Sequence, residues 1–138
     1  MADEAVCIET PSRFARFTVA DAGAIAIGTI MQLSSDPHTI TASSGADEPF
    51  AGIAWEEKTA SDGITELTVA LDGVWDIKAT AAGNVLGELV AIGGANLIVT
   101  ADAADILNGA IIGYLEETQA ASEVCRVRLT KFGSSGQL

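Results

Sequence analysis

The chain has 138 residues, a formal net charge of −12 and 49% hydrophobic residues. This length and apolar content predict one folded domain and argue against disorder through its body. The shortage of clustered Lys and Arg argues against nucleic acid as a partner, and the absence of an apolar run of about 18 residues argues against a membrane span.

The first half of the chain is predicted to consist of short strands separated by turns. Residues 13–20 and 64–71 alternate between two faces, which is the period of a half-buried strand. Residues 50–56 are mostly apolar, which predicts a strand buried on both faces. The expected strands are 5–8, 13–20, 25–33 with an interruption at Gly28, 39–42, 50–56, 64–71 and 74–79.

The second half continues this pattern and contains one stretch with a different signal. Residues 100–107 are rich in Ala, offer Thr100 or Asp102 as a helix cap, and stop at Asn108-Gly109. That stretch is interpreted as a short helix or, as an open alternative, a loop. The expected strands are 86–92, 97–100, 110–115 and 124–129.

The two halves repeat each other at a spacing of about 59 residues. Four collinear blocks match, and period is the first property to establish in a chain. The matched blocks are 25–31 with 84–90, 40–42 with 99–101, 50–57 with 110–117, and 67–71 with 125–129.

This repeat predicts an all-β fold, namely a small β-barrel or a β-tulip or sandwich built from two related halves. Residues 1–20 are expected to form an extended N-terminal arm and a first strand outside the repeat. The duplicated barrel domain is expected over 21–132, with halves of about 21–78 and 79–132. Residues 133–138 are expected to be a flexible tail.

No catalytic set or cofactor motif emerges from the residues. His38 is the only histidine and lies in a turn, so no histidine-based metal or nucleophile motif can be assembled. Glu56-Glu57 and Glu116-Glu117 are paired carboxylates, which fit either an acid/base or divalent-ion site or a charged strand end that the duplication copied. We expect the second interpretation, and therefore no enzyme, no cofactor and no metal.

Cys7 and Cys125 are the only cysteines. Both lie among apolar residues, which favours buried free thiols. Whether they pair stays open at this point, because a disulfide requires Cα atoms within about 7 Å.

Four segments of the repeat resemble the capsid cement or head decoration proteins of tailed viruses, the DUF2190-like family. Residues 22–33 resemble the family's opening pattern G-x-A-I-x-x-G-x-x-V-x-L, and residues 49–56 resemble its P-x-G-V-A-x-E/D segment. Residues 66–74 resemble a V-x-V-x-x-x-G-V strand pair, and residues 81–90 resemble I-x-A-G-D-x-V. The likeness covers roughly residues 22–129.

The resemblance implies a β-barrel or β-tulip protein that decorates the outer surface of an assembled viral capsid. It implies the major capsid protein as partner, a homotrimer as the oligomer, and stabilisation of contacts between capsid subunits as the function. An alternative from a different class is a small carbohydrate-binding β module, for which Trp55, Trp75 and Tyr114 are the aromatic candidates.

Attachment to a capsid is expected to involve the N-terminal segment, which lies outside the matched blocks. Aromatic residues and Arg are the usual anchors of interfaces. The alternative is that residues 13–20 are simply the first strand of the barrel. The candidate capsid-binding residues are Pro11, Arg13, Phe14, Arg16 and Phe17.

The charges are unevenly distributed. Between Phe17 and Cys125 the basic residues are Lys58 and Lys78 alone, and the other five lie near the termini. This pattern fits either dispersed acidic loops or a two-sided molecule whose more basic side meets a partner.

Overall fold

A computed structural model describes residues 3–45, 48–80, 87–120 and 122–129. In these ranges the chain is almost entirely β. The elements are β1 (Val6–Glu9), β2 (Phe14–Thr18), β3 (Ile30–Leu33), β4 (Ile40–Ala42), β5 (Phe50–Ala54), β6 (Glu66–Ala70), β7 (Val74–Ala79), β8 (Leu89–Gly94), β9 (Leu97–Thr100), α1 (Ala103–Asn108), β10 (Ile111–Leu115) and β11 (Val124–Leu129). The described residues include no helix of the length and apolarity that crossing a membrane requires.

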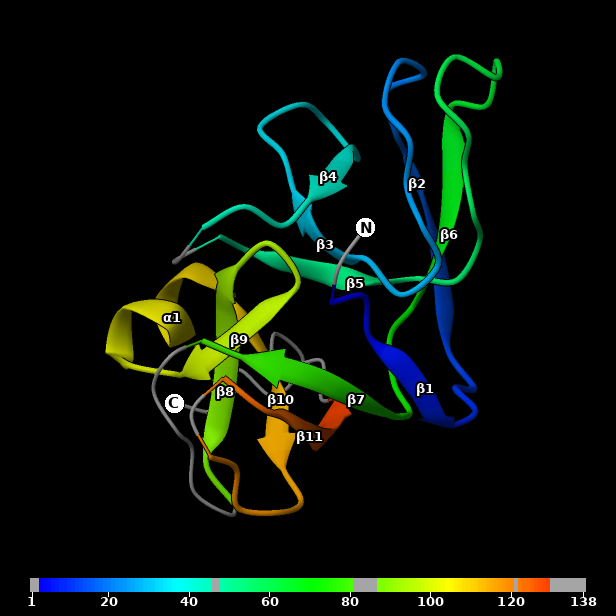
Figure 1. Ribbon diagram of the computed structural model, residues 1–138. Coiled ribbons are helices and arrows are strands. Elements are labelled where there is room, and N and C mark those ends of the chain that lie inside the picture. Colours follow the sequence, from blue (N-terminus) through cyan, green and yellow to red (C-terminus); the bar gives the residue numbers. More distant parts are fainter. Residues whose placement is uncertain (1–2, 46–47, 81–86, 121, 130–138) are drawn as a thin grey trace.

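Strands of the second half form a closed barrel. Its order is β7-β11-β10-β8-β9, and a parallel pairing of Lys78 with Leu97 and of Ala79 with Ile98 joins β9 back to β7. The barrel forms the lower part of Figure 1, with α1 at its side. Closure leaves these strands few free edges.

Strands of the first half form a second sheet in the same order. The order β2-β6-β5-β3-β4 corresponds strand for strand to β7-β11-β10-β8-β9. Its outer strands also meet, at an isolated parallel bridge between Thr18 and Thr39. The predicted all-β fold with two related halves is therefore confirmed, and each half builds its own sheet rather than contributing to one shared barrel.

The two sheets share an irregularity as well as an order. A register shift occurs in β5 beside Gly52 and in β10 beside Gly113, where each strand pairs with the equivalent strand β3 or β8. By strand pairing Gly52 therefore corresponds to Gly113, and this spacing is one residue longer than the spacing of the matching sequence blocks. Strand β7 holds the position in the barrel that β2 holds in the first sheet, so the two structural copies begin at β2 and at β7. The sequence blocks instead suggest a boundary between residues 78 and 79.

A core shared between the two sheets holds them together. Side chains of β3 and β5, such as Ile30 and Phe50, pack in one cluster with barrel residues such as Trp75 and Ile112. A second cluster fills the interior of the first sheet. Strand β5 lies between the two clusters and is buried at every position, as its apolar sequence predicts.

The expected N-terminal arm lies on the body of the protein. Strand β1 pairs antiparallel with Val74–Asp76 of β7, on the same edge that β9 covers further along at Lys78 and Ala79. Ala5 is buried and donates its N–H to the carbonyl of Gly28 at 2.8 Å. Residues 5–9 thus belong to the fold. The tail predicted over 133–138 lies outside the described residues.

Helix α1 forms where the sequence allows either a helix or a loop. Asp102 is its N-cap, and the Asp102 and Asp105 side chains each accept the other's backbone N–H in a capping box. Gly109 ends the helix in the left-handed conformation. Thr100, the other cap candidate, is the last residue of β9.

Candidate attachment surface

The five candidate residues lie on β2 and the segment before it, at the end of the first sheet. Pro11 is buried and presents little surface to a partner. Arg13 is exposed, and Phe14 is 43% exposed. Phe17 is half-buried and stacks on His38, with ring centroids 4.8 Å apart.

Asp72 fixes the start of β2. Its carboxylate accepts the backbone N–H of Ser12 at 2.8 Å, the hydroxyl of Ser12 at 2.9 Å and the backbone N–H of Arg13 at 3.1 Å. Burial alone would raise the pKa of Asp72, but the hydrogen bonds from Ser12 and Arg13 outweigh it and hold the pKa below its ordinary value. The segment that carries Arg13 and Phe14 is therefore positioned by the turn before β7.

Arg16 is committed to partners within the protein. Its guanidinium donates to Glu66 at 3.2 Å and to the Thr68 hydroxyl at 2.9 Å, and lies 3.7 Å from Glu56. The side chain remains 54% exposed, so these ion pairs are screened by solvent. Arg13 and Phe14 are thus the better available anchors of the set.

An aromatic row connects Phe14 to the shared core. The ring centroids of Phe14 and Trp55 are 5.5 Å apart. Trp55 in turn meets Trp75 edge-on, with a centroid distance of 6.1 Å. Trp75 is 1% exposed, and Trp55 is partly buried against the same core. Two of the three aromatics considered for a sugar-binding role are therefore packing residues.

Strand β2 also presents backbone groups at a free edge. The carbonyl of Arg13 accepts from Leu71 on the β6 side, whereas that of Arg16 accepts from His38 on the other side. Because residues of a strand alternate, the N–H groups of Phe14 and Arg16 point away from β6. In the described part of the chain, no strand covers that stretch of the edge.

The paired glutamates have a shared structural task. Glu56 accepts the backbone N–H of Thr68 at 3.0 Å, and Glu117 accepts that of Arg126 at 2.9 Å. Thr68 and Arg126 hold equivalent positions on β6 and β11, so the same glutamate-to-backbone hydrogen bond occurs in both halves. Within the described ranges, no group of three or more His, Cys, Asp or Glu side chains could hold a metal ion.

Lys58 is a residue whose role the sequence did not reveal. Its ammonium has no exposed surface and donates to the carbonyls of Asp21 at 2.6 Å and Thr59 at 3.1 Å and to the Asp62 carboxylate at 3.0 Å. The backbone N–H of Ile64 and the Lys58 ammonium lower the pKa of Asp62. This cluster ties the turn at 21–25 to the loop at 58–64.

Cys7 and Cys125 are both free thiols. Cys125 is buried, and its pKa is raised to about 12 by burial and by the nearby carboxylates of Glu117 and Asp76. Burial also raises the pKa of Cys7. The thiols are therefore protonated and of low reactivity at neutral pH.

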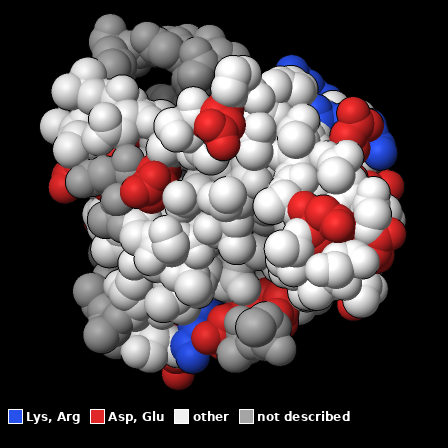
Figure 2. Space-filling model, turned by 90° about the horizontal axis from the view of Figure 1, so that it is seen from above, with Lys and Arg blue, Asp and Glu red and all other residues white. Residues whose placement is uncertain are grey.

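Basic side chains gather in two places. Arg13 and Arg16 lie on or beside β2, and Lys78, Arg126 and Arg128 lie on β7 and β11. On the face seen in Figure 2 the acidic side chains are dispersed, and Lys and Arg appear near its margins. Each basic side chain on β7 and β11 has an acidic partner within 3.5 Å, so this second group is not an open cationic patch.

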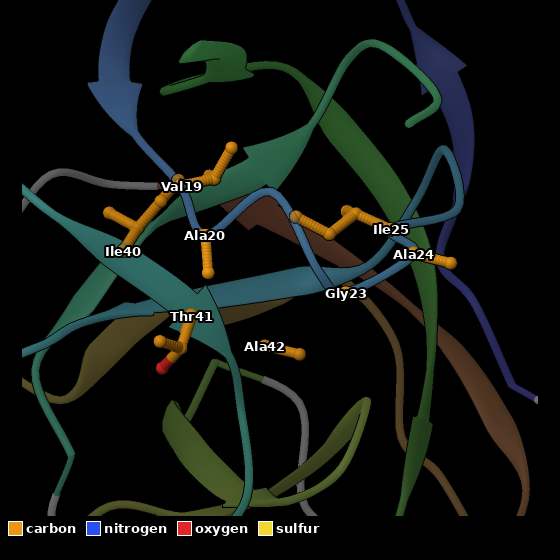
Figure 3. Close-up of a pocket in the computed structure, with 8 residues that line it drawn as sticks. All are labelled: Val19, Ala20, Gly23, Ala24, Ile25, Ile40, Thr41 and Ala42. Carbon is orange, nitrogen blue, oxygen red and sulfur yellow. The ribbon is translucent and has the colours of Figure 1, made fainter. Parts of the chain in front are cut away.

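A cavity of about 180 Å³ opens between β4 and the segment that follows β2. Figure 3 shows its lining side chains, which are apolar apart from Thr41. The lining residues are Val19, Ala20, Gly23, Ala24, Ile25, Ile40, Thr41 and Ala42.

Comparison with solved structures finds the same fold in a phage protein. The head fiber gp8.5 N base of bacteriophage phi29 superimposes with a TM-score of 0.54 at 13% sequence identity, over 86% of this chain and 96% of that chain. No protein-family model and no curated protein matches the sequence. The likeness therefore shows a common fold, and the resemblance to the DUF2190-like family is not confirmed.

Proposed function

We propose that this protein is a structural component of a phage virion that decorates the outer surface of the capsid. The observation that carries the proposal is the shared fold with a phage head fiber base, over nearly the whole of that chain. The resemblance of four sequence segments to capsid decoration proteins suggests the same class, although no family model matches the sequence. The proposed role is to stabilise contacts between major capsid subunits, without catalysis or a cofactor.

The proposed attachment surface is the exposed start of β2. Phe14 presents an aromatic ring backed by Trp55, and Arg13 lies next to it, positioned by Asp72. A rigid aromatic anchor with a neighbouring Arg is the usual centre of a protein interface. A homotrimer would present three such surfaces, so that modest affinity for each would suffice on a symmetric shell.

Co-sedimentation with undecorated shells of the same phage tests this function. We expect the protein to pellet with shells and Phe14→Ser to lower its occupancy about tenfold or more. Leu107→Ser is the matched control, because Leu107 is 78% exposed on α1, away from β2. Light scattering should show a trimer.

Two outcomes would contradict separate parts of the proposal. Failure of the unaltered protein to bind shells at any concentration would reject capsid decoration. Equal occupancy for Phe14→Ser and the unaltered protein would keep decoration and move attachment to another surface.

A further inference from the structure

The seam between the first and last strands of each sheet differs between the two halves. Both sheets form the equivalent first pair, Thr18 with Thr39 and Lys78 with Leu97. The barrel adds the pair Ala79 with Ile98, and the N–H of Thr80 donates to the carbonyl of Ile98 at 2.9 Å.

In the first sheet the seam opens after its first pair. Val19 and Ile40 hold the positions of Ala79 and Ile98 but do not pair. The N–H of Ala20 and the carbonyl of Ile40, which correspond to the bonded groups of the barrel, have no hydrogen-bond partner in the described ranges. The apolar cavity lies at this point, lined by both sides of the seam.

Strand β4 offers main-chain groups to the cavity. Thr41 pairs with Gln32 of β3, and the Thr39 carbonyl accepts the N–H of Ser34. Because residues alternate along a strand, Ile40 and Ala42 direct their backbone groups away from β3. A free strand edge beside an apolar cavity is the arrangement by which proteins bind an extended peptide.

The Lys58 cluster keeps the seam apart. Ile25 and Lys58 exchange both backbone hydrogen bonds, at 2.9 and 2.8 Å, and the Lys58 ammonium holds the Asp21 carbonyl. These bonds anchor residues 21–25 to the loop beyond β5, so the segment after β2 turns away from β4. The opening is thus built into the fold rather than left by a loose loop.

We propose that this seam binds an extended segment of a partner protein, which adds to the edge of β4 and places one apolar side chain in the cavity. The chain's net charge of −12 favours a segment with Lys or Arg on either side of the apolar residue. In the barrel the equivalent edge of β9 is covered by β7, so the occupant expected at β4 is likewise an extended segment. The inference does not depend on capsid decoration.

A synthetic probe tests the site directly. The blocked peptide Lys-Val-Leu-Val-Lys would be titrated into ¹⁵N-labelled full-length protein and followed by amide chemical shifts. We expect saturable shifts confined to residues 19–25 and 39–43. Three altered peptides serve as controls: one with Leu replaced by Ser, one with alternate amides N-methylated, and one with Lys replaced by Glu. Each should bind at least about tenfold more weakly.

A variant of the protein gives a second, independent test of the site. Ala20 is exposed, and its methyl group lies among the lining side chains in Figure 3. Ala20→Phe should fill the cavity and weaken peptide binding about tenfold, whereas Ala104→Phe on α1 should leave it unchanged. Both variants would first be checked for an unchanged melting temperature. If Ala20→Phe fails to fold, the series of altered peptides still tests the site, because it uses the unaltered protein.

Three results would overturn the inference. The first is the absence of saturable shifts, and the second is a pattern of shifts centred on β2 or β1. The third is a change of the seam amides upon dilution without peptide, which would make a second copy of this chain the occupant.

Discussion

At the scale of single residues, Lys58 shows how burial changes what a charged side chain does. The ammonium is enclosed, and each hydrogen it donates goes to a carbonyl or carboxylate of two neighbouring turns. A buried charge is tolerated only when its partners are complete. Since no local pattern distinguishes this Lys from a solvated one, its role appears only in three dimensions.

Lys58→Met should destabilise the protein by about 2–4 kcal/mol, because the carbonyls of Asp21 and Thr59 and the carboxylate of Asp62 lose a donor that is itself fully buried. Urea unfolding followed by tryptophan fluorescence measures the change. Lys78→Met is the control, since Lys78 is partly exposed and pairs with Asp3 at the surface, and it should change stability by less than about 0.5 kcal/mol. Equal effects of the two substitutions would contradict the assigned role.

Asp62 and Asp72 should make stability depend on acid. Both have a pKa below the ordinary value of 3.8 in the folded protein. Their ionised forms therefore stabilise the fold above that pH, and the stabilisation is lost as pH falls through the folded pKa. We expect the melting temperature to fall steeply below about pH 4. Asp72→Asn should be less stable at pH 7 and lose less on acidification; an unchanged slope would refute this.

At the scale of elements, a glycine lies beside the register shift in both β5 and β10. A Cβ at Gly113 would overlap the carbonyl oxygen of Arg128, and one at Gly52 would lie 2.8 Å from that of Ala70. Gly52 also has φ of 139°, which side chains disfavour. Each glycine lets its strand approach the next one closely.

Gly113→Ala and Gly52→Ala should each cost about 3 kcal/mol or more, because a backbone atom cannot move aside as a side chain can. Gly23→Ala is the control, since a Cβ there would meet nothing within 4 Å, and we expect a change of less than about 0.5 kcal/mol. Thermal unfolding compares the three variants. Tolerance of Ala at Gly113 would mean that β10 and β11 are not held in this register.

Strand β1 should be required for stability. Deletion of residues 1–9 removes the strand beside β7 and uncovers core residues that Ala5 and Cys7 contact. We expect the melting temperature to fall by about 10 °C or more. Val6→Thr, at a position that is 59% exposed, should shift it by no more than about 2 °C. A truncated protein that melts like the full chain would restore the interpretation of this segment as a free arm.

The elements themselves could largely be predicted from the sequence. Alternation marks β6 and β7, continuous apolarity marks β5, and Asp102 and Gly109 mark the ends of α1. What could not be predicted is the pairing of β1 with β7, because the sequence of a short strand does not specify its neighbour. The sequence also groups Pro11 with the exposed Phe14, although the structure buries Pro11, because a single residue between two strands carries no pattern that indicates its burial.

At the scale of the whole molecule, the shared core joins two topologically equivalent sheets into one unit. Ile30 and Phe50 of the first sheet and Trp75 and Ile112 of the barrel belong to one cluster. We therefore expect a single cooperative transition, with calorimetric and van't Hoff enthalpies that agree within about 10%. Two resolved transitions would show that the sheets fold independently despite this contact.

The proposed surface and the seam were only partly accessible from sequence. The exposure of Phe14 and Arg16 follows from their place on one face of an alternating strand, whereas that of Arg13, which precedes the strand, does not. The seam does not, since it arises where Val19 and Ile40 fail to pair although their counterparts do. Only a comparison of the two sheets in space makes that difference visible.

The ion pairs on the two equivalent strand pairs run in opposite directions. In the first sheet the Arg is on β2 and its acidic partner Glu66 is on β6, whereas in the barrel Asp76 is on β7 and Arg126 is on β11. A duplicated chain can misfold by exchanging equivalent strands between its halves.

Such an exchange is opposed by these charges. If β2 paired with β11 in the equivalent register, Arg16 would face Arg126. Like charges in such positions destabilise a strand pair. The reversal thus gives β2 a preference for β6 over β11, which opposes the exchange of that strand between the two copies of the motif.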